Sequence, residues 1–396
     1  MKPITVLHVI DSLALGGTES QLVRTLRQLD PSRYRSVLCL LRWMEHSTLQ
    51  ALDDRIETHT LGLALKNDYV QGVVRLRDLI RRIAPDVLHT YLFRATIIGR
   101  VAARLTHRPV VTTLANTPYE TLWRIDDPGL NRWKTGIVRA MDAATAAWTT
   151  RYVANSEAVK RSAMRHLRVP EDRITVIPRG IAWENLAVIS PEQVQAARAE
   201  LGWTDAGPLL LCVGRLVPQK GLRYLVDAMA VVAKKLPGAR LGIAGEGRLR
   251  ASLEAQIRTL GLGRIVRLLG ERRDVPCLLA AADVFVFPSL SEGFPNALLE
   301  AMAYGRPCIA SAIDAVEEIA GTDGTILVPP RSPQALAEAI LGAAGDPQRR
   351  RTLAAAAHLR ARAFDMDDSV ERLEEIYRSM APGHDVGAPL VGANMR

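Results

Sequence analysis

The chain has 396 residues, 48% of them hydrophobic and 23% charged, which excludes a disordered or low-complexity protein. At roughly 100–200 residues per domain, this length predicts two domains, each with a sizeable core. The net charge is +9 at pH 7, and no apolar run approaches the roughly 20 residues of a membrane-spanning helix.

The first half of the chain alternates short apolar runs with helix-length segments. The N-terminal segment MKPITVLHVIDS lacks the long apolar region and cleavage site of a signal peptide, so we interpret it as a buried strand. Runs rich in Val, Ile and Leu are typical of strands buried on both faces of a parallel sheet. Such strands are predicted at 4–11, 35–42, the end of 76–91, 108–115, 151–156 and 172–180.

The same alternation restarts after about residue 188. Strands are predicted at 207–216, 239–247, 265–272, 283–289, 307–312 and 325–330, with helices between them. Two such series imply two doubly wound α/β domains that face each other across a cleft. We therefore assign one domain to 1–187 and the other to 188–365.

The end of the chain predicts one more helix, at about 366–380, and then a tail. In FDMDDSVERLEEIYRSM, Asp367 is a candidate N-cap, and Leu373 and Tyr377 belong to an apolar stripe. The last segment, 381–396, is expected to be flexible.

The four cysteines are predicted to be buried, reduced thiols. Cys39, Cys212 and Cys308 lie in strand-like apolar runs, and Cys277 lies in a helix-like apolar run. None forms a Cys-x-x-Cys pair, and no cluster has the spacing of metal ligands. This usage fits a reducing cytoplasm.

The positive charge is concentrated in the first half. Residues 1–187 hold 27 Lys and Arg against 18 Asp and Glu, whereas 188–396 hold 24 of each. Five of the six tryptophans also lie there: Trp43, Trp123, Trp133, Trp148 and Trp183. A basic half with tryptophans suits an anionic membrane surface or another anionic partner. A merely soluble basic face is the alternative, and no nucleic-acid-binding motif is apparent.

Two glycines follow the first predicted strand, in LALGGTESQ. The turn lacks the Gly-x-Gly-x-x-Gly pattern of dinucleotide-binding folds, but Gly16 and Gly17 allow the backbone to approach a ligand closely. Thr18 and Gln21 have the spacing of a capping box, which predicts that a helix begins here. The amides of such a helix end attract phosphate. An ordinary strand-to-helix turn is the alternative.

Two cations flank the first turn of the second half, GRLVPQKG. Arg215 and Lys220 follow a strand that ends at Val213, and a helix is predicted after Gly221. Cations at the C-terminal edge of a parallel sheet point into the ligand crevice, where they can bind phosphate. Two solvated cations are the alternative. The Gly-Lys-Ser/Thr order of a Walker loop is missing.

The stretch SEGFPNALLEAM places Glu292 and Glu300 eight residues apart. A helix is predicted to begin at Pro295 and Asn296, and its first amides would form a second phosphate site. A carboxylate accepts hydrogen bonds from two vicinal hydroxyls. Glu300 is therefore a candidate ligand of a ribose, and Glu292 of a sugar on the second phosphate. A capping acid and a surface acid are the alternative.

Together these motifs resemble a known family. EGFPNALLEAM is similar to the Glu-x7-Glu signature of retaining glycosyltransferases of family 4, which have the GT-B fold of two Rossmann-like domains. GRLVPQKG, AGEG, DVFVFPS and GGTESQ match the same family in the same order, over about residues 4–380. The C-terminal half matches specifically, and the N-terminal half matches loosely outside its first loop.

The resemblance implies a role for each motif. Arg215 and Lys220 would hold the donor diphosphate, Glu300 the ribose and Glu292 the donor sugar. The other implied donor-binding residues are Gly16, Gly17, Gly245, Glu246, Gly293, Phe294, Pro295 and Asn296. The last helix would cross back onto the N-terminal domain. No cofactor and no metal would be required, because cations and helix ends neutralise the leaving group.

The chain departs from the family in two places. Many members carry a histidine after the strand that here reads VVTTLANTP, whereas this chain has Ala115 and Asn116. His89 is the remaining candidate catalytic histidine, and a structural role is its alternative. Many members also have Asn-Gly where this chain has Arg179 and Gly180.

These observations predict a retaining glycosyltransferase that moves a sugar from a UDP- or GDP-linked donor to a glycan or lipid-linked acceptor, in surface polysaccharide or glycolipid assembly. We expect a cytoplasmic location, and we leave open a peripheral association with the inner face of the cell membrane. The alternatives are a nucleotide-sugar epimerase or a phosphorylase on a similar scaffold, and a non-catalytic basic module that binds membranes.

Overall fold

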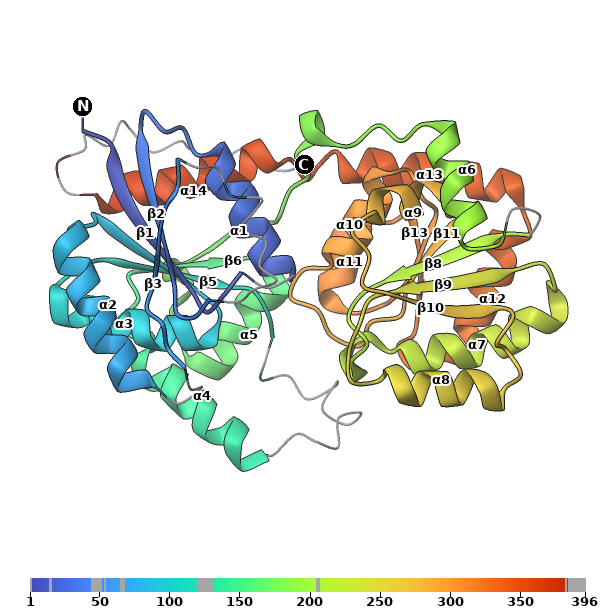
Figure 1. Cartoon of the computed structure of the whole chain (residues 1–396), viewed down its shortest axis with the longest axis horizontal. Helices are drawn as coiled ribbons and strands as arrows, with labels where there is room; N and C mark the ends of the chain where they lie inside the picture. The colour runs from blue at the N-terminus through green and yellow to red at the C-terminus, as the bar shows by residue number, and fades with distance from the viewer. Residues whose placement is uncertain are drawn as a thin grey trace.

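The computed structural model describes residues 2–13, 16–43, 52, 55–64, 68–117, 119, 132–203, 207–381 and 383. They form two α/β domains that lie side by side along the long axis of the molecule (Figure 1). The predicted fold of two doubly wound domains is therefore confirmed. The predicted tail at 381–396 lies outside the described residues, apart from positions 381 and 383.

The N-terminal domain contains a seven-stranded parallel sheet in the order β3-β2-β1-β4-β5-β6-β7. Its strands are β1 (Ile4–Ile10), β2 (Tyr34–Leu40), β3 (Glu57–Thr60), β4 (Val87–Tyr91), β5 (Val110–Leu114), β6 (Arg151–Ala154) and β7 (Ile174–Val176). Its helices are α1 (Gly17–Gln28), α2 (Tyr69–Ile83), α3 (Phe93–Thr106), α4 (Arg132–Ala146) and α5 (Glu157–Leu167). β3 was not predicted from the sequence, because this polar, exposed edge strand has no apolar pattern.

The C-terminal domain contains a six-stranded parallel sheet in the order β10-β9-β8-β11-β12-β13. Its strands are β8 (Leu209–Val213), β9 (Arg240–Ala244), β10 (Val266–Gly270), β11 (Val284–Phe287), β12 (Cys308–Ser311) and β13 (Thr325–Val328). Its helices are α6 (Pro191–Glu200), α7 (Leu222–Lys235), α8 (Arg250–Thr259), α9 (Val275–Ala281), α10 (Asn296–Ala303), α11 (Asp314–Ala320), α12 (Pro333–Ala344) and α13 (Pro347–Ala361).

The strand order of each sheet reverses at one point. In the first sheet β1 lies between β2 and β4, and in the second β8 lies between β9 and β11. Ligands of open α/β sheets bind outside the carboxyl ends of the strands at such a reversal. The topology therefore predicts that a ligand binds at the loops that follow β1, β8 and β11.

The chain passes between the domains twice, at adjacent positions. The Ile181 N–H donates to the Phe364 carbonyl (2.9 Å), and the Met366 N–H donates to the Ile181 carbonyl (3.1 Å). A Cβ atom added to Gly180 would lie 2.3 Å from the Asp365 backbone, so a side chain at position 180 would collide with the second crossing. The two crossings thus form one narrow link between the domains.

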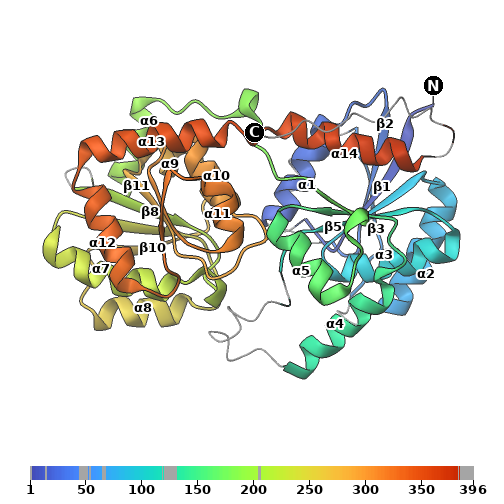
Figure 2. The ribbon, with the colours of Figure 1, turned by 180° about the vertical axis from the view of Figure 1, so that it is seen from behind.

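The last helix, α14 (Met366–Met380), packs on the N-terminal domain (Figure 2). Its buried residues share one hydrophobic core with strands of the first sheet, and this core includes Ile4, Val6, Val87, Met366, Val370, Leu373 and Tyr377. The predicted N-cap was wrong. Asp365 caps the helix, because its carboxylate accepts from the Asp367 N–H (2.9 Å), which places Asp367 inside the first turn.

Candidate active site

The N-termini of two helices face each other between the domains. The helix α1 follows β1 in the first domain, and α10 follows β11 in the second. The Asn296 side-chain amide donates to the Gly17 carbonyl (3.4 Å), and a Cβ atom on Gly17 would lie 2.6 Å from the same amide nitrogen. The absence of a side chain at position 17 therefore leaves room for this approach of the two helix ends.

The start of α1 differs from the predicted capping box. The helix begins at Gly17, with Gly16 in an extended conformation as its N-cap and with no side-chain capping bond. Thr18 therefore lies inside the first turn, and its hydroxyl accepts a hydrogen bond from the Arg179 guanidinium (3.0 Å). Gln21 instead reaches the Met366 sulfur (3.8 Å). The helix start was predicted correctly, but its capping residues were not.

Two predicted donor ligands, Lys220 and Glu292, are partners of each other. The Lys220 ammonium lies 2.5 Å from a Glu292 carboxylate oxygen, and their side chains are only 17% and 8% exposed. The Ser289 hydroxyl donates to the same oxygen (2.5 Å). Gly221 ends the turn that carries Lys220, and its φ of 61° is a conformation that favours glycine. The Pro288 carbonyl also leaves no room for a Cβ atom at this position. The pair is therefore held in place at the C-terminal edge of the sheet.

Glu300 lies in the second turn of α10 and forms an ion pair across the cleft. Its carboxylate accepts from the Arg24 guanidinium of α1 (3.3 Å), and both side chains are partly exposed. Arg24 does not stand out in the sequence, because the contact joins residues 276 positions apart in different domains.

Arg215 and the predicted residues Gly245 and Glu246 lie on adjacent loops after β8 and β9. The Leu216 N–H donates to the Glu246 carbonyl (2.8 Å), and a Cβ atom on Gly245 would lie 2.0 Å from the Gly214 carbonyl. The Glu246 carboxylate is occupied by Arg250 of α8 (2.5 Å). Arg215 itself is exposed.

The loop before α10 is anchored to both domains. The Ser156 hydroxyl donates to the Gly293 carbonyl (2.7 Å), and a Cβ atom on Gly293 would lie 1.9 Å from the Ala115 carbonyl. The Phe294 ring is buried and packs edge-to-face on Phe364, with ring centres 6.2 Å apart. Pro295 is the residue before the first turn of α10. Phe294 therefore anchors this loop in the hydrophobic core of the second domain.

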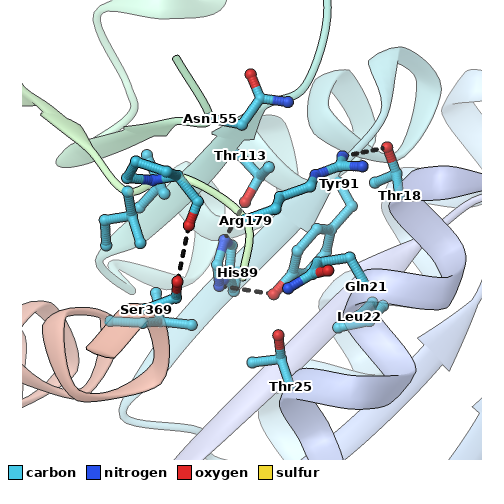
Figure 3. Close-up of a pocket in the computed structure, with 14 residues that line it drawn as sticks. Thr18, Gln21, Leu22, Thr25, His89, Tyr91, Thr113, Asn155, Arg179 and Ser369 are labelled. Carbon is cyan, nitrogen blue, oxygen red and sulfur yellow. Dashed lines mark hydrogen bonds between the residues drawn. The ribbon is translucent and has the colours of Figure 1, made fainter. Parts of the chain in front are cut away.

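His89 is buried in the middle of β4, not at a strand end, and belongs to a hydrogen-bonded network. Its Nε2 lies 2.7 Å from the Thr113 hydroxyl, and its Nδ1 lies 2.6 Å from the Tyr377 hydroxyl and 2.9 Å from the Tyr91 hydroxyl. Burial holds the pKa of His89 well below its ordinary value, so the ring is neutral at pH 7. Figure 3 shows His89 in one pocket with Arg179, which extends toward Thr18.

Three of the four cysteines are buried, as predicted, and several tryptophans are exposed. Cys39, Cys212 and Cys308 are buried, and burial raises the pKa of Cys39 and of Cys212 to about 12, which keeps them as thiols. Cys277 is only partly buried, and it packs against the edge of the hydrophobic core of the second domain. Trp43, Trp133 and Trp148 are exposed, whereas Trp123 lies outside the described residues.

Two family profiles match the chain. Residues 15–184 match the one described as Glycosyltransferase Family 4, and residues 207–346 match the one described as Glycosyl transferases group 1. Over 271 residues the chain is 32% identical to the Escherichia coli UDP-Gal:α-D-GlcNAc-diphosphoundecaprenol α-1,3-galactosyltransferase, covering 66% of this chain and 68% of that one. The chain belongs to glycosyltransferase family 4.

This family 4 glycosyltransferase is also similar to a second curated relative and to two solved structures. It is 28% identical over 392 residues to the D-inositol 3-phosphate glycosyltransferase of Thermobispora bispora, covering 94% of this chain and 88% of that one. It superposes on Anabaena HepE in complex with UDP-glucose with a TM-score of 0.82 at 22% identity, covering 95% and 100% of the two chains. For WaaG, a glycosyltransferase involved in lipopolysaccharide biosynthesis, the TM-score is 0.76 at 18% identity, covering 96% and 100%. The predicted GT-B fold and family are confirmed.

Proposed function

We propose that this glycosyltransferase moves a sugar from a nucleotide diphosphate sugar to a lipid-linked or glycan acceptor, with retention of the anomeric configuration. The observation that carries the proposal is the meeting of two helix N-termini, α1 and α10, beside Arg215 and Lys220. Backbone amides and cations in this arrangement favour a diphosphate. The two acids of the motif, Glu292 and Glu300, lie on the same side of the cleft.

We infer the following chemistry for this site. The bond between the sugar C1 and the phosphate oxygen breaks, and a bond from C1 to the acceptor oxygen forms on the same face. The departing diphosphate takes up the negative charge, which Arg215, Lys220 and the helix ends stabilise. One of its oxygens receives the acceptor proton. Glu300 would hold the ribose and Glu292 the sugar, so that the reacting atoms are already positioned. We propose that neither a metal nor a cofactor is required.

The relatives support a choice of donors to test. The Escherichia coli relative is named for UDP-Gal and HepE was solved with UDP-glucose, which favours uridine. A Corynebacterium glutamicum relative, 33% identical over 214 residues, is named for GDP-mannose, so guanosine donors also need testing. The diphosphoundecaprenol acceptor in the first name supports a lipid-linked acceptor here.

We also propose a cytoplasmic protein that associates peripherally with the inner membrane face, where a lipid-linked acceptor would be held. The basic N-terminal half and its exposed tryptophans, of which Trp133 is 85% exposed, support this location. Among the described residues, no helix combines the length and apolarity needed to cross a membrane.

A thermal-shift screen tests the proposed function. UDP- and GDP-linked sugars would be added singly, and the matching donor is expected to raise the Tm, since about 100-fold excess over Kd stabilises by about 2.7 kcal/mol. With that donor, free nucleoside diphosphate should appear only after an acceptor is added, and NMR of the product should show the retained anomer. Conversion of the donor sugar without an acceptor would instead identify an epimerase. Stabilisation by none of the donors would contradict the proposal.

A further inference from the structure

The pocket shown in Figure 3 contains a buried guanidinium to which the family motifs assign no role. Arg179 lies on the first crossing between the domains and is only 9% exposed. One of its terminal nitrogens donates to the Thr18 hydroxyl at the start of α1 (3.0 Å). The other would lie 3.2 Å from a Cβ atom on Gly17. Arg179 is thus directed at the same helix end that faces α10.

Two carboxylates from different domains lie close enough to this guanidinium to act on it electrostatically. Glu19 of α1 and Glu292 before α10 both interact electrostatically with Arg179. Burial lowers the pKa of Arg179 to about 10, and the two acids act in the opposite direction. The guanidinium therefore keeps its charge at neutral pH. A buried cation needs such anionic partners, because an unpaired charge in a protein interior is strongly destabilising.

The Glu19 carboxylate occupies the end of α1. Its side chain folds back over Gly16, where an added Cβ atom would lie 2.3 Å from one carboxylate oxygen. Its neighbouring cations are Arg179 and Arg215, which both act on it electrostatically. An anion thus lies where a helix end meets two arginines from the two sides of the cleft. That combination of donors suits a phosphate equally well.

We propose that the Glu19 carboxylate holds the place of a donor phosphate in this structure, and that Arg179 contacts the diphosphate once Glu19 is displaced. The inference rests on the proposed function and adds two residues to it. Arg179 becomes a third cation on the leaving group, beside Arg215 and Lys220. Glu19 acts as a competing intramolecular anion, which keeps Arg179 paired when no donor is bound.

Calorimetric titration with UDP, GDP and the two free nucleosides tests this assignment. Arg179→Gln should weaken binding of the preferred diphosphate about 10- to 100-fold, the loss expected for a charged hydrogen bond, and leave nucleoside binding unchanged. Glu19→Gln should strengthen diphosphate binding several-fold, because the competing charge is gone. Arg161→Gln is the matched control, since Arg161 forms an exposed ion pair with Asp314 of the other domain (2.6 Å) and should bind as the wild type does.

The outcomes separate the two proposals. A wild-type protein that binds neither diphosphate contradicts the proposed function itself. If the wild type binds a diphosphate and Arg179→Gln binds it with the same affinity, the proposed role of Arg179 is wrong. Weaker diphosphate binding in Glu19→Gln overturns the placeholder role. If Arg179→Gln loses its cooperative thermal transition, the Glu19→Gln titration decides alone, because a gain in affinity does not arise from damaged folding.

Discussion

Glu292 and Glu300 belong to one motif, but the structure gives them different partners. Glu300 lies in α10 and is partly exposed, whereas Glu292 is buried against Lys220. Glu300→Gln is expected to weaken binding of free nucleoside diphosphate, because the ribose loses a partner. Glu292→Gln should leave that affinity nearly intact and sharply reduce transfer, as expected for an interaction made mainly in the transition state. Calorimetry and transfer rates measure the two effects.

A control separates the ribose role of Glu300 from its ion pair. Arg24→Gln removes the partner of Glu300 but keeps the carboxylate, and a partly exposed pair contributes only about 0–1 kcal/mol. Nucleotide affinity should therefore stay unchanged in Arg24→Gln. The reverse pattern, with Glu292 governing affinity and Glu300 governing turnover, would exchange the two roles. Full activity in both Gln variants would mean that neither glutamate acts in donor binding or transfer, and that the two are only a capping acid and a surface acid.

For single residues, the sequence predicts which side chains are candidates for the site better than it predicts which residues they contact. Arg215, Lys220 and the two glutamates stand out because charged residues sit beside strand-to-helix turns. Their partners do not stand out. Arg24 meets Glu300 only through the packing of two domains. Glu19 looks like an ordinary first-turn acid, and its position between arginines depends on where the interdomain crossing carries Arg179.

At the scale of elements, α14 covers two buried histidines, His8 on β1 and His89 on β4. The ring of Tyr377 lies within 6.2 Å of both, measured between ring centres. Burial lowers the pKa of His8 to about 3 and that of His89 well below its ordinary value. Their pKa in the unfolded chain is about 6.5. The unfolded state therefore binds more protons below that pH, and the stability of the N-terminal domain should fall as the pH decreases from about 6.5.

Each histidine contributes a slope of about 1.4 kcal/mol per pH unit well below pH 6.5. Urea unfolding followed by tryptophan fluorescence at several pH values between 8 and 4 measures the total slope, to which carboxylates also contribute. His8→Gln isolates one histidine and should flatten the slope by about that amount. An unchanged slope would mean that His8 is protonated in the folded protein.

The elements themselves follow closely from the sequence, because buried parallel strands are almost continuous apolar runs. Every predicted strand is present, and β3 is the one strand missed in the part of the chain that the structure describes. Helix ends are harder to predict, since several residues compete for each cap. Gly16 replaces Thr18 at the start of α1, and Asp365 replaces Asp367 at the start of α14. Both errors are two residues: the Asp365 carboxylate caps α14, whereas α1 begins at Gly17 with no side-chain capping bond.

At the scale of the whole molecule, the uneven charge predicts a salt-sensitive membrane interaction. The N-terminal half carries the entire net charge of +9, and Trp133 stands exposed on α4 between Arg132 and Lys134 in the sequence. Each cation near an anionic surface contributes about 1 kcal/mol, reduced by salt. The protein should sediment with phosphatidylglycerol vesicles at low salt, less at high salt, and less again after Trp133→Ala. Equal sedimentation with phosphatidylcholine vesicles would contradict this expectation.

Because α14 completes the core of the N-terminal domain, the first domain to leave the ribosome is the last to be finished. At about 5–20 residues per second, about 10–40 s separate synthesis of β7 from synthesis of α14. During that interval the sheet face around Ile4, Val6 and Val87 lacks its cover. The hydrophobic cores of the C-terminal domain use only residues up to Phe364, so that domain can fold earlier. The nascent chain therefore exposes one defined apolar face until its synthesis is almost complete, and a chaperone that binds this face would protect it from aggregation.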